Sequence, residues 1–143
     1  MTARRPIGIL RVFVDTSAFF ALLDERDASH AAAVSILARL AAEPSQLLTT
    51  NLILAECHAL ILARLGRRPA LRFLDDVRES STNVIRGSVA DEQSAVAILR
   101  RYDDKDFSFT DASCFAVIER LKLTAAFSFD RNFAQYGLTV LQS

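Results

Sequence analysis

The 143-residue chain has little of what marks a secreted, zinc-binding or membrane protein. It contains only two cysteines, Cys57 and Cys114, and two histidines, His30 and His58. One potential cysteine pair does not make a disulfide framework, and without a Cys-x-x-Cys motif a zinc site has little support. The apolar runs are too short or too interrupted to cross a bilayer, which needs about 20 helical residues. We therefore expect a cytoplasmic protein with no membrane contact.

The N-terminus also lacks the pattern of a secretory signal. Arg4 and Arg5 precede an apolar stretch, but Gly8 and Arg11 interrupt it, and it ends at Asp15 rather than at a small-residue cleavage site. We expect no cleaved leader here.

Neither sign of charge is in excess, because 17 basic residues balance 17 acidic ones. A neutral total excludes a whole-protein field that would attract a polyanion, although a charged site remains possible. Lysine is scarce among the cations, which suits bidentate phosphate contacts by arginine, but a compositional bias explains it equally well. Arg4, Arg5 and Arg11 load the N-terminus, and a second group is Arg64, Arg67 and Arg68. Either group is a candidate for phosphate contacts, and a solvated surface is the alternative.

The chain has no Pro/Gly/Ser-rich linker, no low-complexity tract and no repeat. With 51% hydrophobic and 24% charged residues it has the balance of a protein with a core, so we predict a single domain over residues 1–143.

Short apolar segments alternate with helical patterns along the chain. We predict strands at 9–14, 46–50, 83–86, 124–128 and 138–141, and helices at 16–23, 29–42, 52–63, 69–79, 90–101, 111–121 and 131–135. This alternation is typical of an α/β fold in three α/β/α layers, with a mostly parallel five-stranded sheet. Phe127, Phe129 and Phe133 are predicted to belong to its core.

Acidic residues follow two of the predicted strands directly. Asp15 follows the first strand in Val-Asp-Thr-Ser, and Asp130 follows the fourth. Open parallel sheets bind ligands beyond the carboxyl ends of their strands, so both side chains are expected in one crevice. Taken singly, each is better explained as the N-cap of the next helix.

Two further carboxylates stand on predicted helices. Glu56 is the only acidic residue in an apolar helix, and a carboxylate leaving an apolar face needs a cation or hydrogen-bond donors; an outward, solvated position is the alternative. Asp111 falls in a first helical turn that Thr110 is predicted to cap, where the helix dipole favours negative charge. Asp106 lies in the preceding loop and is equally compatible with a solvated position.

Helix capping explains these carboxylates one by one, but it gives no reason for all of them to lie on one edge of the sheet. A cluster of carboxylates repels itself unless it binds a divalent cation, and oxygen ligands suit Mg²⁺ or Mn²⁺. Carboxylate-held metals commonly serve phosphoryl chemistry, so hydrolysis of a phosphodiester by metal-activated water is the leading reaction class.

These motifs, taken together, resemble those of PIN-domain ribonucleases of the VapC toxin type. The matching elements are Val14-Asp15-Thr16-Ser17, Glu56, Thr110-Asp111-Ala112 and the segment from Ser128 to Phe133, in the family's order. The resemblance implies a PIN-like fold and an acidic quartet, Asp15, Glu56, Asp111 and Asp130, that holds Mg²⁺ or Mn²⁺. Asp15 and Asp111 would ligate the metal most directly, and Glu56 and Asp130 directly or through water.

The resemblance also implies supporting roles and partners. Thr16, Ser17 and Ser128 match hydroxyl positions that support the cluster, with Ser128 where the family usually has threonine, and Asp106 has at most a supporting role. The implied function is a metal-dependent endoribonuclease, the toxin of a type II toxin–antitoxin pair. Its partners would be substrate RNA, a second copy of the chain and a cognate antitoxin, and Arg64, Arg67 and Arg68 become candidate RNA contacts.

Three alternatives are weighed against this interpretation. A haloacid-dehalogenase-like phosphatase would need a second aspartate where this chain has Ser17. A phosphoacceptor receiver would need an acidic pair after the first strand and a Lys-Pro near the end, and both are absent. A non-toxin or degenerate PIN-domain protein, acting as an RNA-binding or dimerisation module, stays open.

Overall fold

Residues 8–143 are described in the structure, a computed structural model, so Arg4 and Arg5 lie outside the described part. Five strands form one sheet in the order β3-β2-β1-β4-β5, and every neighbouring pair is parallel. Their bounds are β1 Leu10–Val14, β2 Ser45–Thr50, β3 Asn83–Ile85, β4 Ala125–Phe127 and β5 Thr139–Val140. The predicted five-stranded α/β sheet is confirmed.

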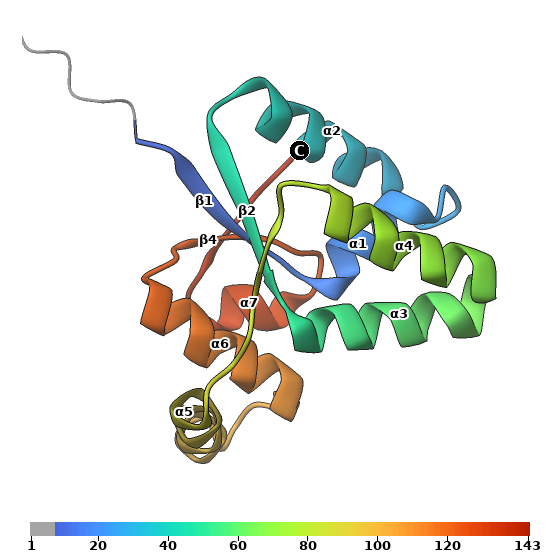
Figure 1. The fold of residues 1–143 in the computed structure, drawn as a ribbon. Helices are drawn as coiled ribbons and strands as arrows, with labels where there is room; N and C mark the ends of the chain where they lie inside the picture. The colour runs from blue at the N-terminus through green and yellow to red at the C-terminus, as the bar shows by residue number, and fades with distance from the viewer. Residues whose placement is uncertain (1–7) are drawn as a thin grey trace, which may run out of the picture.

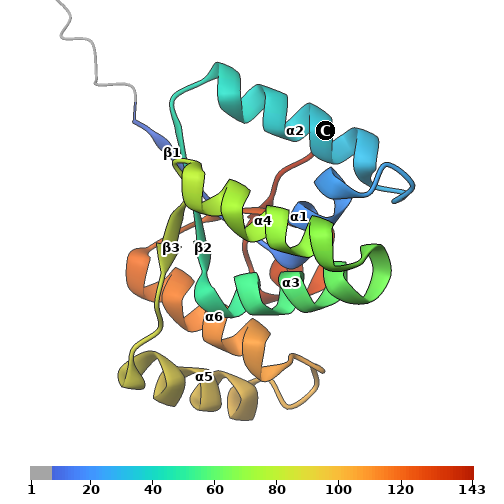
Figure 2. The same cartoon turned by 45° about the vertical axis from the view of Figure 1, so that its right-hand side comes forward.

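Helices connect the strands, as parallel pairing requires. They are α1 Thr16–Leu23, α2 His30–Ala42, α3 Asn51–Leu65, α4 Arg67–Glu79, α5 Val89–Arg101, α6 Phe109–Leu121 and α7 Arg131–Tyr136. Helices α1, α2 and α4 cover one face of the sheet, α6 and α7 cover the other, and α5 packs outside α6 (Figures 1 and 2). Within residues 8–143, no helix is long and apolar enough to cross a membrane.

The alternation of side chains along the central strand divides the core in two. In β1, Val12 and Val14 pack with α1 and α2, while Phe13 faces the opposite way and stacks on Phe133 of α7 with ring centroids 5.8 Å apart. Phe127 belongs to the α1/α2 side of the core. The predicted core positions of Phe127 and Phe133 are therefore confirmed.

Phe129 was expected in the core and is not there, because its side chain is 36% exposed. It lies beyond the end of β4, where the chain has left the sheet, and its ring meets that of Phe127 edge-on at 6.1 Å. The alternating phenylalanines suggested a strand that continues past the residue at which β4 ends.

The register of the central strands decides which residues meet at the carboxyl edge. Val14 pairs with Phe127, so the residues that follow them, Asp15 and Ser128, are neighbours in space. The Asp15 backbone N–H donates to the Phe127 carbonyl at 3.1 Å, and Thr49 of β2 donates its hydroxyl to the Val14 carbonyl at 2.9 Å. Three strands thus end together at one edge.

Candidate active site

Asp15 lies at the centre of that edge, and its side chain is almost fully buried, with 4% of its surface exposed. It is the N-cap of α1, as its position after the first strand predicted. It accepts hydrogen bonds from Ser17 Oγ at 2.8 Å and Ser128 Oγ at 3.0 Å. These bonds, and the weaker one from the Ser17 backbone, all end on Oδ2 and leave Oδ1 for another ligand.

Burial raises the pKa of Asp15 to about 6, and the hydrogen bonds from Ser17 and Ser128 only partly oppose it. The physical cause is desolvation, which penalises the charged form of a carboxyl group. An ionised Asp15 is therefore under-compensated by this chain alone, and a cation next to it would lower the cost.

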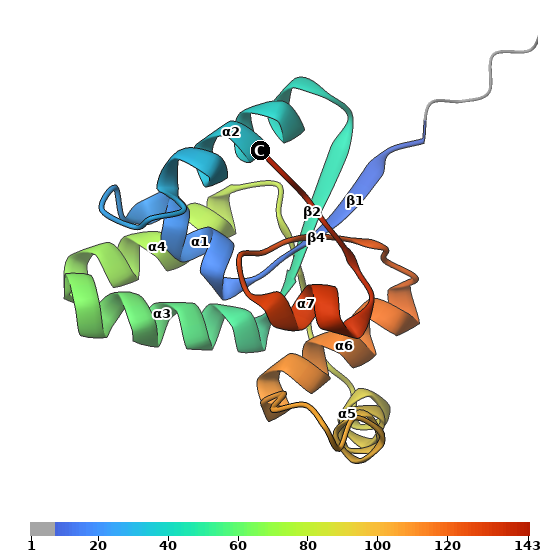
Figure 3. The same cartoon turned by 180° about the vertical axis from the view of Figure 1, so that it is seen from behind.

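A chain of hydrogen bonds joins Asp15 to two other predicted site residues. Ser128 Oγ accepts from the Asp130 backbone N–H at 3.0 Å, and Asp130 Oδ1 accepts from the backbone N–H of Asn132 at 2.9 Å. The Asn132 side-chain amide then donates to Asp111 Oδ2 at 3.0 Å. The loop after β4 and the start of α7 thus connect β1 to α6; Figure 3 shows α6 and α7 adjacent.

Asp111 holds a different place in its helix from the one predicted. Helix α6 begins at Phe109, and its N-cap is Ser108, not Thr110. Ser108 and Asp111 form a reciprocal capping box, in which each side chain accepts from the other's backbone N–H at 3.0 and 3.1 Å. The Ser-x-x-Asp spacing was present in the sequence and predicts this cap better than Thr110 does.

Asn132 is the residue that sequence reasoning missed. It fixes Asp111 Oδ2 from the first turn of α7, a helix of only six residues. Its place two residues after Asp130 was visible, but its contact with Asp111, 21 residues away, depends on how α7 packs on α6.

Glu56 is exposed on α3, so the expected apolar surroundings were wrong. Among residues 8–143 no hydrogen bond or ion pair engages it. Its charge nevertheless reaches the site, because burial first, and then the charges of Asp15, Asp111 and Glu56, raise the pKa of Cys114. The Cys114 thiol itself is buried and lies 3.6 Å from Thr50 Oγ1.

The remaining predicted residues divide between the site and the surface. Thr16 is buried beside Asp15, and its hydroxyl has no hydrogen-bond partner within the described residues. Asp106 is exposed in the loop before α6. Arg64 lies over the Phe20 ring at 5.4 Å, about 12 Å further along α3 than Glu56 by helical rise, and Arg67 and Arg68 begin α4 beyond it. The arginine group therefore does not adjoin the acidic cluster.

No three His, Cys, Asp or Glu side chains in the described part are close enough together to form a preassembled metal cage. The donor chemistry still fits Mg²⁺ or Mn²⁺, which use carboxylate and hydroxyl oxygens and keep several waters, so that one or two carboxylates suffice. The free Oδ1 of Asp15 and the unpartnered Thr16 hydroxyl are suitable donors. A thiolate site does not fit, because burial together with the charges of Asp15 and Glu56 raises the pKa of Cys57 to about 12.

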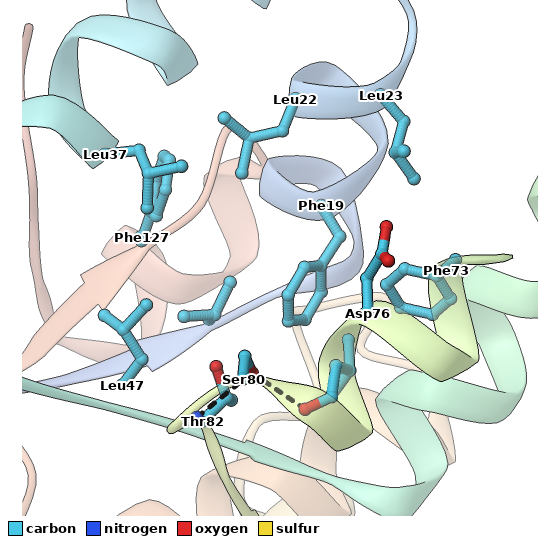
Figure 4. Close-up of a pocket in the computed structure, with 12 residues that line it drawn as sticks. Phe19, Leu22, Leu23, Leu37, Leu47, Phe73, Asp76, Ser80, Thr82 and Phe127 are labelled. Carbon is cyan, nitrogen blue, oxygen red and sulfur yellow. Dashed lines mark hydrogen bonds between the residues drawn. The ribbon is translucent and has the colours of Figure 1, made fainter.

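A separate apolar cavity of about 320 Å³ opens on the α1/α2/α4 side of the sheet. Figure 4 shows Phe19 and Leu22 of α1, Leu37 of α2 and Phe73 of α4 around it. Its lining also includes Val14 and Phe127, the strand residues that directly precede Asp15 and Ser128. None of the residues assigned to the acidic cluster lines this cavity.

Residues 12–138 match the PIN domain family. The chain therefore belongs to the PIN domain family. It is 34% identical over 127 residues to the 23S rRNA-specific endonuclease VapC20 of Mycobacterium tuberculosis, covering 88% of this chain and 94% of that one. It is also 32% identical over 128 residues to a VapC ribonuclease of Archaeoglobus fulgidus, covering 87% of this chain and 80% of that one.

Solved structures agree with this fold. The crystal structure of VapC20, described as a sarcin–ricin loop cleaving toxin, matches with a TM-score of 0.85 at 30% identity and covers 92% of this chain and 99% of that one. VapBC2 of Rickettsia felis matches with a TM-score of 0.69 at 12% identity, covering 94% of this chain and 100% of that one, which supports the fold alone. The predicted PIN-like three-layer fold is thereby confirmed.

Proposed function

We propose that this chain is a metal-dependent endoribonuclease that hydrolyses RNA phosphodiester bonds, and that it is the toxin of a toxin–antitoxin pair. The observation that carries the proposal is the buried, desolvated carboxylate of Asp15, joined through Ser128, Asp130 and Asn132 to Asp111 at one edge of a PIN-type sheet. The identity to named VapC nucleases over most of both chains supports it.

Each residue of the cluster has a definite task in this proposal. Asp15 and Asp111 hold Mg²⁺ or Mn²⁺ most directly, each with one oxygen fixed by the protein and the other available. Glu56 and Asp130 complete the site directly or through water. When bound, the ion polarises the phosphate and lowers the pKa of water for attack.

Other side chains position these ligands. Ser17 and Ser128 orient Asp15, and Thr16 offers its unpartnered hydroxyl. Asp106, exposed in the loop before α6, adds negative charge at most. Arg64, Arg67 and Arg68 lie away from the cluster, so they would contact only a distant part of a long RNA.

The decisive experiment maps the 5′ ends of cellular RNAs after a pulse of expression, with Asp111→Asn as the control. We expect new ends that require intact Asp111, and cleavage by the purified protein that EDTA abolishes and Mg²⁺ or Mn²⁺ restores. Because VapC20 is named as specific for 23S rRNA, this RNA is the first purified substrate to test. Identical end profiles for parent and variant would refute the nuclease assignment.

A non-catalytic module with the same fold predicts a different result. Calorimetric titration with Mn²⁺ should show one site that Asp15→Asn removes. Titrations that do not differ between parent and variant would favour the RNA-binding or dimerisation alternative.

We further propose that the apolar cavity of Figure 4 receives a segment of the cognate antitoxin. Its lining is mostly apolar and comes from α1, α2, α4 and the sheet, so an apolar stretch of the antitoxin would fill it. Leu37→Asp should abolish neutralisation by the protein of the neighbouring reading frame while leaving RNA cleavage intact. Leu71→Asp, at a comparably exposed leucine outside the cavity, is the matched control.

We also propose that the chain is cytoplasmic and forms a homodimer. Both cysteines are free and buried, which suits a reducing compartment. Exposed apolar side chains on α3 and α5, including Leu62 and Val96, offer area for a second copy. Sedimentation velocity of Leu62→Glu against the parent tests this, since the variant should be monomeric.

A further inference from the structure

A second cavity, of about 440 Å³, adjoins the acidic cluster directly, and we call it the β4–α7 cavity. It lies between the loop from β4 to α7, the start of α2 and the chain after β5, which returns to lie beside α2 (Figures 1 and 2). Asp130 of the acidic cluster lines it, and so does Ser128, which donates to Asp15 Oδ2 at 3.0 Å. The wall of this cavity and the support of the central carboxylate are therefore the same residue.

Phe129 presents an open aromatic ring to this cavity. Its backbone is fixed, because its N–H donates to Ser17 Oγ at 2.8 Å and Ser17 Oγ in turn donates to Asp15 Oδ2. Its side chain lines the cavity and is 36% exposed, with the Phe127 ring edge-on against it. Core packing does not account for such a ring, which is available to pack on a planar ligand next to the acidic cluster.

Arg131 places a free cation at the same cavity. It follows Asp130, begins α7 and is exposed, and within residues 8–143 its guanidinium forms no ion pair. A basic side chain stabilises the last turn of a helix rather than the first, so helix stability does not explain its position. A guanidinium beside carboxylates offsets their repulsion of a polyanion and matches the geometry of a phosphate.

The other polar side chains of the lining carry no positive charge. Ser29 makes no capping hydrogen bond in α2, and Gln142 engages only its amide nitrogen, with the Val140 carbonyl at 3.4 Å. Among the described residues that line the cavity, Arg131 is the only basic one. One ring, one guanidinium and neutral polar groups fit a ligand with one planar base, a sugar and one phosphate.

We propose that the β4–α7 cavity binds the nucleotide of the RNA that adjoins the cleaved phosphate, with its base stacked on Phe129 and its phosphate bound by Arg131. The inference rests on the proposed function, which places the cleaved phosphate at the acidic cluster. Because Phe129, Asp130 and Arg131 are consecutive, one short segment supplies the base contact, a carboxylate of the cluster and the phosphate contact. Stacking accepts any base, so the cavity positions the strand and does not select its sequence.

The test measures RNA binding, so that it does not depend on cleavage. The probes are a 5′-fluorescein-labelled single-stranded adenine hexanucleotide and the same ribose–phosphate backbone without bases, titrated in Mg²⁺ with Asp111→Asn protein and followed by anisotropy. In this background Phe129→Ala should weaken binding of the adenine probe about tenfold and leave the abasic probe unchanged. Phe129→Tyr keeps the ring and should retain parental affinity, whereas Phe129→Leu keeps apolar volume without a flat face and should not.

Arg131→Met tests the phosphate contact separately. It should weaken both probes and reduce the slope of log affinity against log salt concentration by about 0.7, the value for one phosphate contact on a single strand. Arg72→Met, at an exposed arginine of α4 outside the cavity, is its matched control. Phe109→Ala, at a phenylalanine that is 50% exposed and does not line the cavity, is the control for Phe129→Ala. Both controls should bind both probes as the parent does.

Three results would overturn the proposal. Equal weakening of the adenine and abasic probes by Phe129→Ala would refute stacking, and an unchanged salt slope in Arg131→Met would refute the phosphate contact. If both variants bind RNA as the parent does but escape neutralisation by the antitoxin, the cavity belongs to a protein interface and the nucleotide site is refuted.

Failure of this site is distinguishable from failure of the nuclease proposal. If the wild-type chain cleaves RNA with Asp111 dependence while the Phe129 and Arg131 variants bind RNA as their parent does, the nuclease stands and the nucleotide site is refuted. If both variants change RNA binding as expected but no cleavage occurs, the RNA contact stands and the nuclease is refuted.

Discussion

The Asn132 side chain donates a hydrogen bond to Asp111 Oδ2 at 3.0 Å and thereby ties the first turn of α7 to the first turn of α6. The same oxygen accepts the Ser108 backbone N–H, so Asp111 Oδ2 is held from two directions. Because Asn132 also donates its backbone N–H to Asp130, one residue fixes two carboxylates of the cluster. The arrangement leaves the other Asp111 oxygen, Oδ1, without a hydrogen bond among the described residues.

Asn132→Ala should lower the RNA cleavage rate about tenfold, because residues that orient metal ligands typically contribute that much to activity or metal affinity. Global stability should change little, since the Asn132 amide is only partly buried. Single-turnover cleavage and Mn²⁺ calorimetry measure the two effects. Gln135→Ala, an exposed position on the same helix, serves as control. Parental activity in Asn132→Ala would show that Asp111 needs no anchor from α7.

Ser128 makes a second test, because its hydroxyl donates to Asp15 Oδ2 and counteracts the rise in the pKa of Asp15. Ser128→Ala removes that donor, so the pKa of Asp15 should rise further and the acid limb of the pH–rate profile should move to higher pH. Ser128→Thr keeps the hydroxyl and should retain the parental profile. An unshifted profile in Ser128→Ala would mean that Asp15 ionisation does not limit cleavage.

The fold was largely predictable because its signals are local. A parallel sheet covered on both faces was indicated by short hydrophobic segments that alternate with helical patterns and by the scarcity of linkers. Asp15 and Asp130, which follow two strands, indicated that the site lies at the carboxyl edge of this sheet. Helix ends were less certain: α6 begins two residues earlier than predicted because Ser108 competes with Thr110 for the cap.

The sequence predicted most of the residues of the site, but not the hydrogen bonds that join them or their exposure. Asp15 and Asp130 are N-caps as well as members of the cluster, so a capping role does not argue against a functional one. The exposure of Glu56 and the Asn132–Asp111 bond depend on how α3, α6 and α7 pack, and no local pattern encodes that packing. The distance of Arg64 from the cluster also follows from the length of α3 rather than from composition.

The raised pKa of Asp15 predicts how metal-free stability depends on pH. Between the ordinary value of 3.8 and about 6, the folded chain retains a proton that the unfolded chain has lost. Stability must therefore fall as pH rises through this window, by about 3 kcal/mol for a shift of about two pH units. Chemical unfolding in EDTA across the window measures it. Asp15→Asn should flatten the dependence and stabilise the protein at neutral pH; a steeper dependence would contradict the sign.

An ion pair between Asp91 of α5 and Arg120 of α6 joins these two helices. Its contribution to stability should depend on pH in the opposite sense to that of Asp15. Asp91, 5% exposed, accepts from Arg120 through both oxygens at 2.9 to 3.2 Å, and these bonds hold the pKa of Asp91 below its usual range. The stabilisation is thus present above the ordinary aspartate pKa and is lost as pH falls below it.

Arg120→Met keeps the aliphatic packing but leaves the Asp91 carboxylate buried and without its cation. Since Arg120 is itself about half exposed, we expect a loss of about 2 kcal/mol, less than for a fully buried pair. Urea unfolding at neutral pH measures the loss, with Arg100→Met on the exposed face of α5 as control. The difference between the two variants should shrink below pH 4, where protonation of Asp91 removes the uncompensated charge. A difference that persists there would assign the effect to packing rather than to charge.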